Sequence, residues 1–333
     1  MNRKQLAVIA GILVSAFFLW LAFRGLDPAA FWQSVQSANP WLIVGGMLLY
    51  GVAVTIITLR WQFLLRAIKP IPLAQLIPLV TIGYMGNNIY PLRSGELLRI
   101  FLLRRNHDVP FGQGATTVVV ERVFDGLVML TFLIVPLAFI DVASPEVRRL
   151  ATITTPIFLT ALATFLALAA RPQWLLGLAG WVAGWLPGKL GALVDDLSRD
   201  IVDGLAGLRS PADLAGTVAA SYATWAVEAL VYWMVAFAFG LGLGYPVMLM
   251  VVAVVNLSFL LPAAPGNVGL FQFFASAVLV AVGIAESTAL AYAVAVHVVI
   301  WLPPTLAGFF FLARQGLRIG AIARADELQK SAA

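Results

Sequence analysis

The chain has 333 residues, of which 61% are hydrophobic and 11% are charged, and its formal net charge is +5. A soluble protein is roughly 45–50% apolar and about 25% charged, so this composition excludes a soluble globule and indicates an integral membrane protein. The sequence has no cysteine and only two histidines, so it offers no disulfide or histidine-rich metal centre, and we expect no metal and no cofactor. Basic residues beside membrane spans explain the positive charge, and we expect no nucleic-acid partner.

Apolar windows along the chain are long enough to cross a hydrocarbon core of about 30 Å. They predict full transmembrane helices at residues 5–24, 40–59, 115–140, 150–170, 215–240 and 287–313. The first window is too long for a signal peptide and no small-x-small cleavage site follows it, so we expect it to be retained. The fold class is therefore an all-α polytopic membrane protein, with about six full transmembrane helices in a single transmembrane domain.

Two further apolar regions are interrupted and are predicted to be broken helical hairpins. Residues 73–105 are broken at NNIYPLRSGE, and residues 247–284 are broken at LPAAPGNVG. Lys and Arg are enriched in cytoplasmic loops. This rule places on the inside Arg3, Lys4, Arg60, Arg66, Lys69, Arg99, Arg104, Arg105, Arg171, Lys189, Arg199, Arg209, Arg314, Arg318 and Arg324. Both termini are then cytoplasmic, and 73–105 must enter and return from the cytoplasm as a re-entrant hairpin.

Each full span carries the chain to the other side of the membrane, so counting spans from the cytoplasmic N-terminus places both ends of residues 247–284 outside. The region is then either a second re-entrant pair or two full spans. Hairpins that enter from opposite faces are typical of inverted-repeat transporters, whose substrate site lies near the midplane. The sequences of the two breaks match only weakly, so the repeat is a hypothesis from topology. The two halves would cover 1–170 and 214–313. Between them, 171–213 is predicted to form interfacial helices on the cytoplasmic leaflet, and 314–333 a cytoplasmic tail.

The first break, within NNIYPLRSGELLRIFLLRR at 87–105, places polar and charged groups in an apolar chain. A helix starts near Glu96, where free amides and the helix dipole favour an anion, and Arg93 and Arg99 add guanidinium groups suited to bidentate phosphate contacts. Glu96 and Arg99, at i and i+3, can pair when no ligand is present. The stretch is either a phosphate-sized anion site that also uses Asn87 and Asn88, or a cytoplasmic loop with ordinary flanking arginines.

The following span begins with VVVERVFDGLVML, which carries three more charges: Glu121, Arg122 and Asp125. Arg122 and Asp125 can form an ion pair at i and i+3. Charges inside a span should face protein or water rather than lipid. These three residues either form a structural ion-pair cluster or contact a substrate directly, and the sequence leaves both interpretations open.

The second half supplies further polar groups. Asn256 and Asn267 surround the second break and can bind a headgroup or contact a neighbouring helix at a kink. Glu228 lies near the middle of a span, where a carboxylate is a candidate for proton coupling or for pairing with an arginine of the first hairpin. His297 is more simply explained as a hydrogen-bonded helix contact.

Three motifs in this order resemble those of the lysylphosphatidylglycerol synthase transmembrane-region family. They are N-x-x-P-x-R-x-G-E-x-x-R from Asn88 to Arg99, E-R-x-x-D from Glu121 to Asp125, and P-x-x-P-G-x-x-G from Pro262 to Gly269. The resemblance covers nearly the whole chain and implies movement of a phospholipid or lipid-phosphate across the plasma membrane. In the family's synthase/flippases a soluble domain follows the membrane half. This chain ends soon after its last span, so we expect that it does not make lysylphosphatidylglycerol.

Three functions follow from these observations. The favoured one is a lipid flippase or scramblase, not an enzyme, in which Arg93, Arg99 and Arg122 hold the phosphate of an anionic phospholipid, an aminoacyl-phospholipid or a polyprenyl-phosphate-linked lipid. The alternatives are a lipid-phosphate enzyme and a non-catalytic membrane partner of a lipid-modifying enzyme. We expect a multi-pass protein in the plasma membrane of a bacterium, and homo-oligomerisation stays open. The sequence has no P-loop that would indicate ATP as the energy source.

Overall fold

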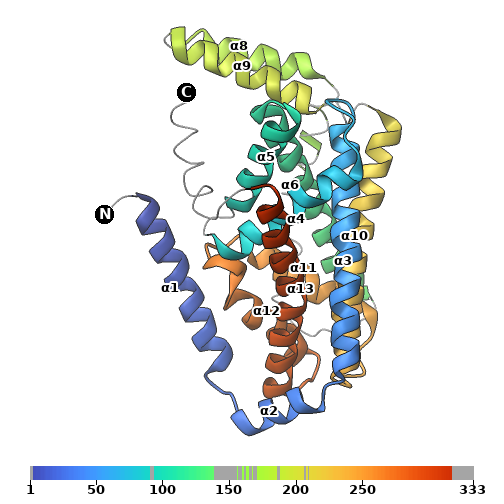
Figure 1. Ribbon diagram of the computed structural model, residues 1–333. Helices are drawn as coiled ribbons and strands as arrows, with labels where there is room; N and C mark the ends of the chain where they lie inside the picture. Colours follow the sequence, from blue (N-terminus) through green and yellow to red (C-terminus); the bar gives the residue numbers. More distant parts are fainter. Residues whose placement is uncertain are drawn as a thin grey trace.

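The computed structural model describes residues 3–90, 94–138, 171–185, 188–205 and 210–316, together with Pro156, Thr160, Ala163, Thr164, Ala167 and Leu208. Every regular element within these residues is a helix (Figure 1). Helices satisfy all backbone hydrogen bonds within one segment, which an apolar surrounding requires. The all-α prediction is confirmed for the described chain.

Three long helices form the frame of the molecule: α3 (Pro40–Leu65), α10 (Pro211–Ala238) and α13 (Glu286–Arg314). Each is long and apolar enough to cross a membrane. Asn39 and Ser210 cap the first two with their side chains, each directly before a proline at the first helical position, the combination that favours a helix start. These helices correspond to the predicted spans at 40–59, 215–240 and 287–313.

The other three predicted spans have different outcomes. The first is α1 (Arg3–Phe23), and its residues 8–23 form a pair with α2 (Pro28–Ser37) that is bent by 88°. The span expected at 115–140 is α6 (Phe111–Ile134), followed by the 3₁₀ turn η2 (Val135–Ala138). Three charged residues near the middle of α6 distinguish it from the purely apolar spans. The span expected at 150–170 lies mostly outside the described residues, so the count of six spans and the inside location of both termini remain predictions.

Contacts between loops define two ends of the bundle. At one end Lys69 donates from Nζ to the carbonyl of His107 at 2.6 Å, and the side chain of Asn106 donates to that of Gln315 at 3.3 Å. We call this the basic end, because Arg66, Lys69, Arg104, Arg105 and Arg314 gather there. At the opposite end the amide of Asn39 donates to the carbonyl of Ala238 at 2.9 Å. The amide of Asp27 donates there to Ser287 Oγ at 3.2 Å. The helices α3, α10 and α13 therefore run from one end to the other.

The first broken hairpin consists of α4 (Leu73–Ile89) and α5 (Ser94–His107) and begins and ends at the basic end. The two helices pack antiparallel through glycines. A Cβ on Gly86 would lie 2.6 Å from Gly95 Cα, and a Cβ on Gly95 would fall on the carbonyl oxygen of Gly83 and the amide of Asn87. Only glycine allows this approach of the backbones.

The second broken hairpin consists of α11 (Tyr245–Ser258), the 3₁₀ turn η4 (Pro265–Asn267) and α12 (Leu270–Ala281). It follows the end of α10 and precedes the start of α13, so it begins and ends at the opposite end of the bundle. Gly266, Asn267 and Gly269 have φ of 70°, 55° and 92° at its break. The helix α1 packs on this break, where Ser15 Oγ accepts from the amide of Ala264 at 2.8 Å.

The helices α8 (Pro172–Ala183) and α9 (Gly188–Gly204) lie across the basic end (Figure 1). The helix α9 packs on the start of α6, with Asp200 against Gly112 and Asp203 accepting from Gln113 at 3.3 Å. Partial burial raises the pKa of the Asp200 carboxyl, and the nearby charges of Asp203 and Asp196 raise it further. Large apolar side chains on α8 and just after it are exposed, and they include Trp174, Trp181 and Trp185. Their place at a membrane surface remains a prediction.

Candidate functional site

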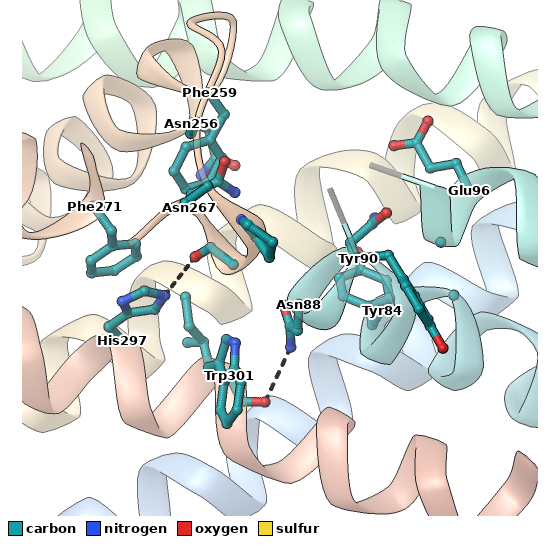
Figure 2. Close-up of a pocket in the computed structure, with 18 of the residues that line it drawn as sticks. Tyr84, Asn88, Tyr90, Glu96, Asn256, Phe259, Asn267, Phe271, His297 and Trp301 are labelled. Atoms are coloured by element: carbon teal, nitrogen blue, oxygen red, sulfur yellow. Dashed lines mark hydrogen bonds between the residues drawn. The ribbon is translucent and has the colours of Figure 1, made fainter. Parts of the chain in front are cut away.

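A cavity of about 420 Å³ lies where the breaks of the two hairpins meet (Figure 2). The carbonyl oxygen of Asn88 would lie 3.3 Å from a Cβ placed on Gly266, so the two tips are in contact. The other walls come from the frame helices. Lining side chains include Tyr50 of α3, Tyr84, Asn87, Asn88 and Tyr90 of the first hairpin, Glu96 and Arg99 of α5, and Arg122 of α6. They also include Trp225 and Glu228 of α10, Asn256, Asn267 and Phe271 of the second hairpin, and His297 and Trp301 of α13.

The asparagines at the first break have different environments. Asn88 donates from Nδ2 to the carbonyl of Trp301 at 3.2 Å (Figure 2). It also donates to Thr305 Oγ1 at 2.8 Å, and the two bonds fasten the hairpin tip to α13. Asn87 Oδ1 is buried and has no hydrogen-bond partner. A buried acceptor without a donor is costly, so Asn87 is the asparagine of this break that is available to a ligand.

A polar network holds the tip of the second hairpin. Gln272 Oε1 accepts from the amide of Gly269 at 2.8 Å, so its amide group faces His297 Nδ1 at 2.7 Å and donates to it. His297 is then neutral, with Nε2 donating to the carbonyl of Gly266 at 2.9 Å, and its ring stacks on Phe271. This is the hydrogen-bonded contact that the sequence favoured over a relay. Asn256 donates to the carbonyl of Val252 within its own helix, and Asn267 occupies the tip itself.

A buried cluster of ion pairs lies beside the cavity and joins α3, α5, α6 and α10. Arg60 pairs through Nη1 with Asp125 and through Nε with Glu121 at 3.4 Å. Glu121 also pairs with Arg99, whose guanidinium stacks on Trp61 at 4.4 Å. Trp225 Nε1 of α10 donates to Asp125 at 2.7 Å. Charges without water are stable only when they are paired, and each of these is, although Arg60 Nε, Glu121 Oε1, Arg122 Nε and Asp125 Oδ2 are buried without a hydrogen bond.

Two expectations about these charges are wrong. Glu96 and Arg99 do not pair with each other, because Arg99 turns into the protein toward Glu121 while Glu96 faces Arg122 at 3.7 Å. Arg60 does not act as an ordinary flank of a span, because its side chain is 1% exposed and bound by two carboxylates. The expected pair of Arg122 with Asp125 is present at 3.3 Å.

The cluster is electrically balanced, with Arg60, Arg99 and Arg122 against Glu96, Glu121 and Asp125. Arg99 is 4% exposed and pairs with Glu121 through Nη2. Arg122 has 38% of its side chain exposed, and its contact with Glu96 is the longest in the cluster. Of the three arginines proposed to hold a phosphate, Arg122 is thus accessible, Arg99 is engaged, and Arg93 lies outside the described residues.

Glu228 lies on the cavity wall with 5% of its surface exposed. Tyr50 and Tyr84 line the same cavity. The expected pairing with an arginine of the first hairpin is absent among the residues that the structure describes.

Sequence reasoning missed Arg60, Tyr50, Tyr84 and Trp301. Arg60 looked like a flanking charge because the hydropathy of its window falls at this residue, although the helix continues to Leu65. The helix α6 contains two carboxylates, Glu121 and Asp125, and one arginine, Arg122. This imbalance could have indicated that another helix supplies a cation. Tyr50, Tyr84 and Trp301 were not singled out, because the only feature that marks them in the sequence is a ring with a polar atom inside an apolar stretch.

Comparison with known proteins agrees with the three sequence motifs. The model of the family described as the lysylphosphatidylglycerol synthase TM region matches residues 8–308. The chain belongs to this family. It is therefore a multi-pass membrane protein of that family, and the resemblance drawn from the motifs is confirmed.

Three proteins that are similar in sequence differ from one another in length and in name. "Glycosyltransferase AglD" of Haloferax volcanii is 25% identical over 328 residues, which cover 89% of this chain and 52% of that protein. A UPF0104 membrane protein of Pyrococcus horikoshii is 22% identical over 339 residues, covering 96% of this chain and 99% of the relative. A UPF0104 membrane protein of Methanocaldococcus jannaschii is 29% identical over 126 residues, 36% of this chain and 37% of the relative. The chain thus spans about half the length of AglD, and these relatives are archaeal, so the expected bacterial origin remains a prediction.

Proposed function

We propose that the protein is a lipid transporter of the flippase or scramblase type, which moves a phosphate-bearing lipid across the plasma membrane. The observation that carries the proposal is the cavity at which two broken hairpins meet after starting from opposite ends of the bundle. Inverted-repeat transporters bind their substrates where broken helices face each other. The candidate lipids are an anionic phospholipid, an aminoacyl-phospholipid and a polyprenyl-phosphate-linked lipid.

Arg122 is the proposed phosphate ligand. Its side chain is 38% exposed and its contact with Glu96 is long at 3.7 Å, so a phosphate can take the place of Glu96. Arginine suits this role because its planar fork binds two phosphate oxygens at once. Asn87 Oδ1, which lacks a donor in the structure, can accept from a hydroxyl or ammonium of the headgroup. Arg93, close in sequence to Glu96, is proposed as a second cation.

The buried ion pairs have a supporting role in this mechanism. Arg60, Arg99, Glu121 and Asp125 tie α3, α5 and α6 together, so these helices move as one body while the second hairpin rocks against them. The headgroup passes through the polar cavity and the acyl chains stay in the bilayer. Rocking of this kind exposes one central site to each side in turn.

Transbilayer movement of labelled lipid in liposomes tests the proposal. The purified protein is compared with Arg122→Ala and Arg122→Lys, using phosphatidylglycerol, lysylphosphatidylglycerol and a polyprenyl phosphate in turn. We expect Arg122→Ala to slow the movement of at least one lipid tenfold or more, equivalent to about 1.4 kcal/mol. Arg122→Lys should recover part of the rate, because lysine keeps the charge without the bidentate geometry.

Arg66→Ala is the matched control. Arg66 pairs with Asp213 at 3.3 Å at the basic end, with 46% of its side chain exposed, and its loss should leave the rate unchanged. Equal rates for the wild type and both Arg122 variants would remove Arg122 from the site. No movement of any lipid by folded wild-type protein would contradict the transporter.

The second candidate is an enzyme, or the non-catalytic membrane partner of an enzyme, in lipid-linked glycosyl transfer. The similarity to a protein named glycosyltransferase favours it. In that case the same purified chain would move no lipid, and the Arg122 variants would instead affect glycosyl transfer in membranes that contain the complete system.

A further inference from the structure

Glu228 is the unbalanced acid of the cavity region. The three arginines and three carboxylates of the neighbouring cluster compensate one another, and no described Lys, Arg or His forms an ion pair with Glu228. Its side chain is nevertheless almost completely buried on the cavity wall. An isolated buried carboxylate is far more stable after it binds a proton.

The groups around Glu228 reinforce this preference. Asp125 of α6, to which Trp225 of the cavity wall donates at 2.7 Å, is a further carboxylate near the cavity and not a cation. Tyr50 of α3 and Tyr84 of α4 line the same cavity as Glu228. Their hydroxyls are neutral at ordinary pH and supply no positive charge.

The other elements that the structure describes around the cavity offer no ion-pair partner for Glu228. From α13 the ring of His297 faces the cavity, and both of its nitrogens are occupied by Gln272 and Gly266. From α11 the cavity receives Asn256, which is neutral. Arg122 lines the same cavity and is held by Glu96 and Asp125.

We propose that Glu228 is a proton-binding site in the cavity and that lipid movement is coupled to the proton it carries. The coupling rests on the proposed transport function, whereas the proton site does not. The ligand is a proton that passes from cavity water to a carboxylate oxygen of Glu228 and returns to water on the other side. The proton-motive force is then the energy source that the sequence does not reveal.

Electrostatics links the proton to the lipid. With Glu228 ionised, its negative charge opposes a phosphate at Arg122 across the same small cavity. With Glu228 protonated, this opposition disappears. Binding of one ligand therefore favours binding of the other by the same factor, and a lipid phosphate and a proton travel in the same direction.

Infrared difference spectroscopy of the reconstituted protein tests the proton site without any transport. The stretching band of a protonated carboxyl should appear as the pH is lowered through the neutral range, and Glu228→Gln should lack it. Glu286→Gln is the matched control, because Glu286 lies exposed in the first turn of α13, and it should retain the band. Absence of a titrating band in the wild type would overturn the proton site.

Liposomes with an imposed pH gradient test the coupling. One proton per phosphate should let each unit of pH difference sustain about a tenfold difference in lipid between leaflets, since one pH unit and a tenfold ratio are the same free energy. Glu228→Gln should lose this asymmetry and Glu286→Gln should keep it. Lipid that equilibrates equally in the wild type with and without a gradient would overturn the coupling.

The two measurements separate the possible failures. A titrating band without movement of any lipid would overturn both the coupling and the transport function while the proton site stands. Movement without a titrating band would overturn the proton site and the coupling that depends on it, while the transport function stands. Both wild-type measurements remain decisive if Glu228→Gln does not fold.

Discussion

Arg60 near the end of α3 and Arg66, the residue that follows this helix, form ion pairs of very different importance for stability. Arg60 is 1% exposed and is bound by Glu121 and Asp125, whereas Arg66 is 46% exposed and pairs with Asp213 alone. Water screens the second pair and not the first. Surface pairs contribute about 0–1 kcal/mol, and the removal of one partner from a buried pair costs about 3–5 kcal/mol.

The first prediction follows from this contrast. Arg60→Ala should lower the free energy of unfolding by about 3–5 kcal/mol, because it leaves two buried carboxylates with fewer cations. Arg66→Ala should change it by less than about 1 kcal/mol. Thermal denaturation in detergent, followed by recovery of the monodisperse protein, measures both. Equal stability of the two variants would show that the Arg60 cluster is hydrated.

The sequence predicted which residue types gather at the breaks better than it predicted their partners. Glu121, Arg122 and Asp125 were recognised as charges that must avoid lipid, and the pair of Arg122 with Asp125 lies within one helix, where spacing decides. The partners of Arg99 and Glu96 come from another helix. Helical spacing carries no information about such contacts, and the expected pair of Glu96 with Arg99 failed for this reason.

At the scale of elements, glycine determines how closely the first hairpin closes. A Cβ on Gly95 would overlap the carbonyl of Gly83 and the amide of Asn87, whereas a Cβ on Gly51 of α3 meets nothing within 4 Å. The α4–α5 contact is therefore a contact of backbones, and no rearrangement of side chains can make room.

The second prediction concerns these two glycines. Gly95→Ala should separate α4 from α5 and reduce lipid movement at least tenfold, because Asn87 and Glu96 then lie in the wrong place. Gly51→Ala should be neutral or slightly stabilising, since alanine favours a helix by about 1 kcal/mol. The same liposome assay and the melting temperature in detergent measure the outcomes. An active Gly95→Ala protein would mean that the hairpin is not packed as described.

Helices and breaks were predictable where the hydropathy pattern and the positions of proline and glycine indicate the same boundary. The breaks at NNIYPLRSGE and LPAAPGNVG lie between α4 and α5 and between α11 and α12. The separate helix α2 was not predicted. It begins within the connection RGLDPAAF, where Asp27 caps the helix and Pro28 starts it, and it continues to Ser37. This capping signal was present in the sequence, but an analysis based on span length does not detect so short a helix.

At the scale of the whole molecule, the two hairpins start from opposite ends. Lys69 and His107 fix the base of the first at the basic end. The second lies between the end of α10 and the start of α13, which meet Asn39 and Asp27 at the other end. The positive-inside rule assigns the basic end to the cytoplasm.

The third prediction tests this arrangement in membranes. The chain has no cysteine, so single cysteines report on the labelled position alone. Asn106→Cys and Gln315→Cys should react with an impermeant maleimide only from the cytoplasmic side, and Ser37→Cys and Ala285→Cys only from the outside. Reaction of Asn106 and Gln315 from different sides would contradict the hairpin and the topology together.

The most direct test of the central claim is photo-cross-linking of a phosphatidylglycerol that carries a diazirine on its headgroup, followed by mass spectrometry of the labelled peptides. The account predicts labelling at 84–90, at Glu96 and within 256–267, the parts of both hairpins that contribute lining residues to the cavity, and loss of this labelling in Arg122→Ala. Labelling confined to outward-facing surfaces, such as those of α1 and α8, and unchanged in Arg122→Ala would contradict a headgroup site between the hairpins.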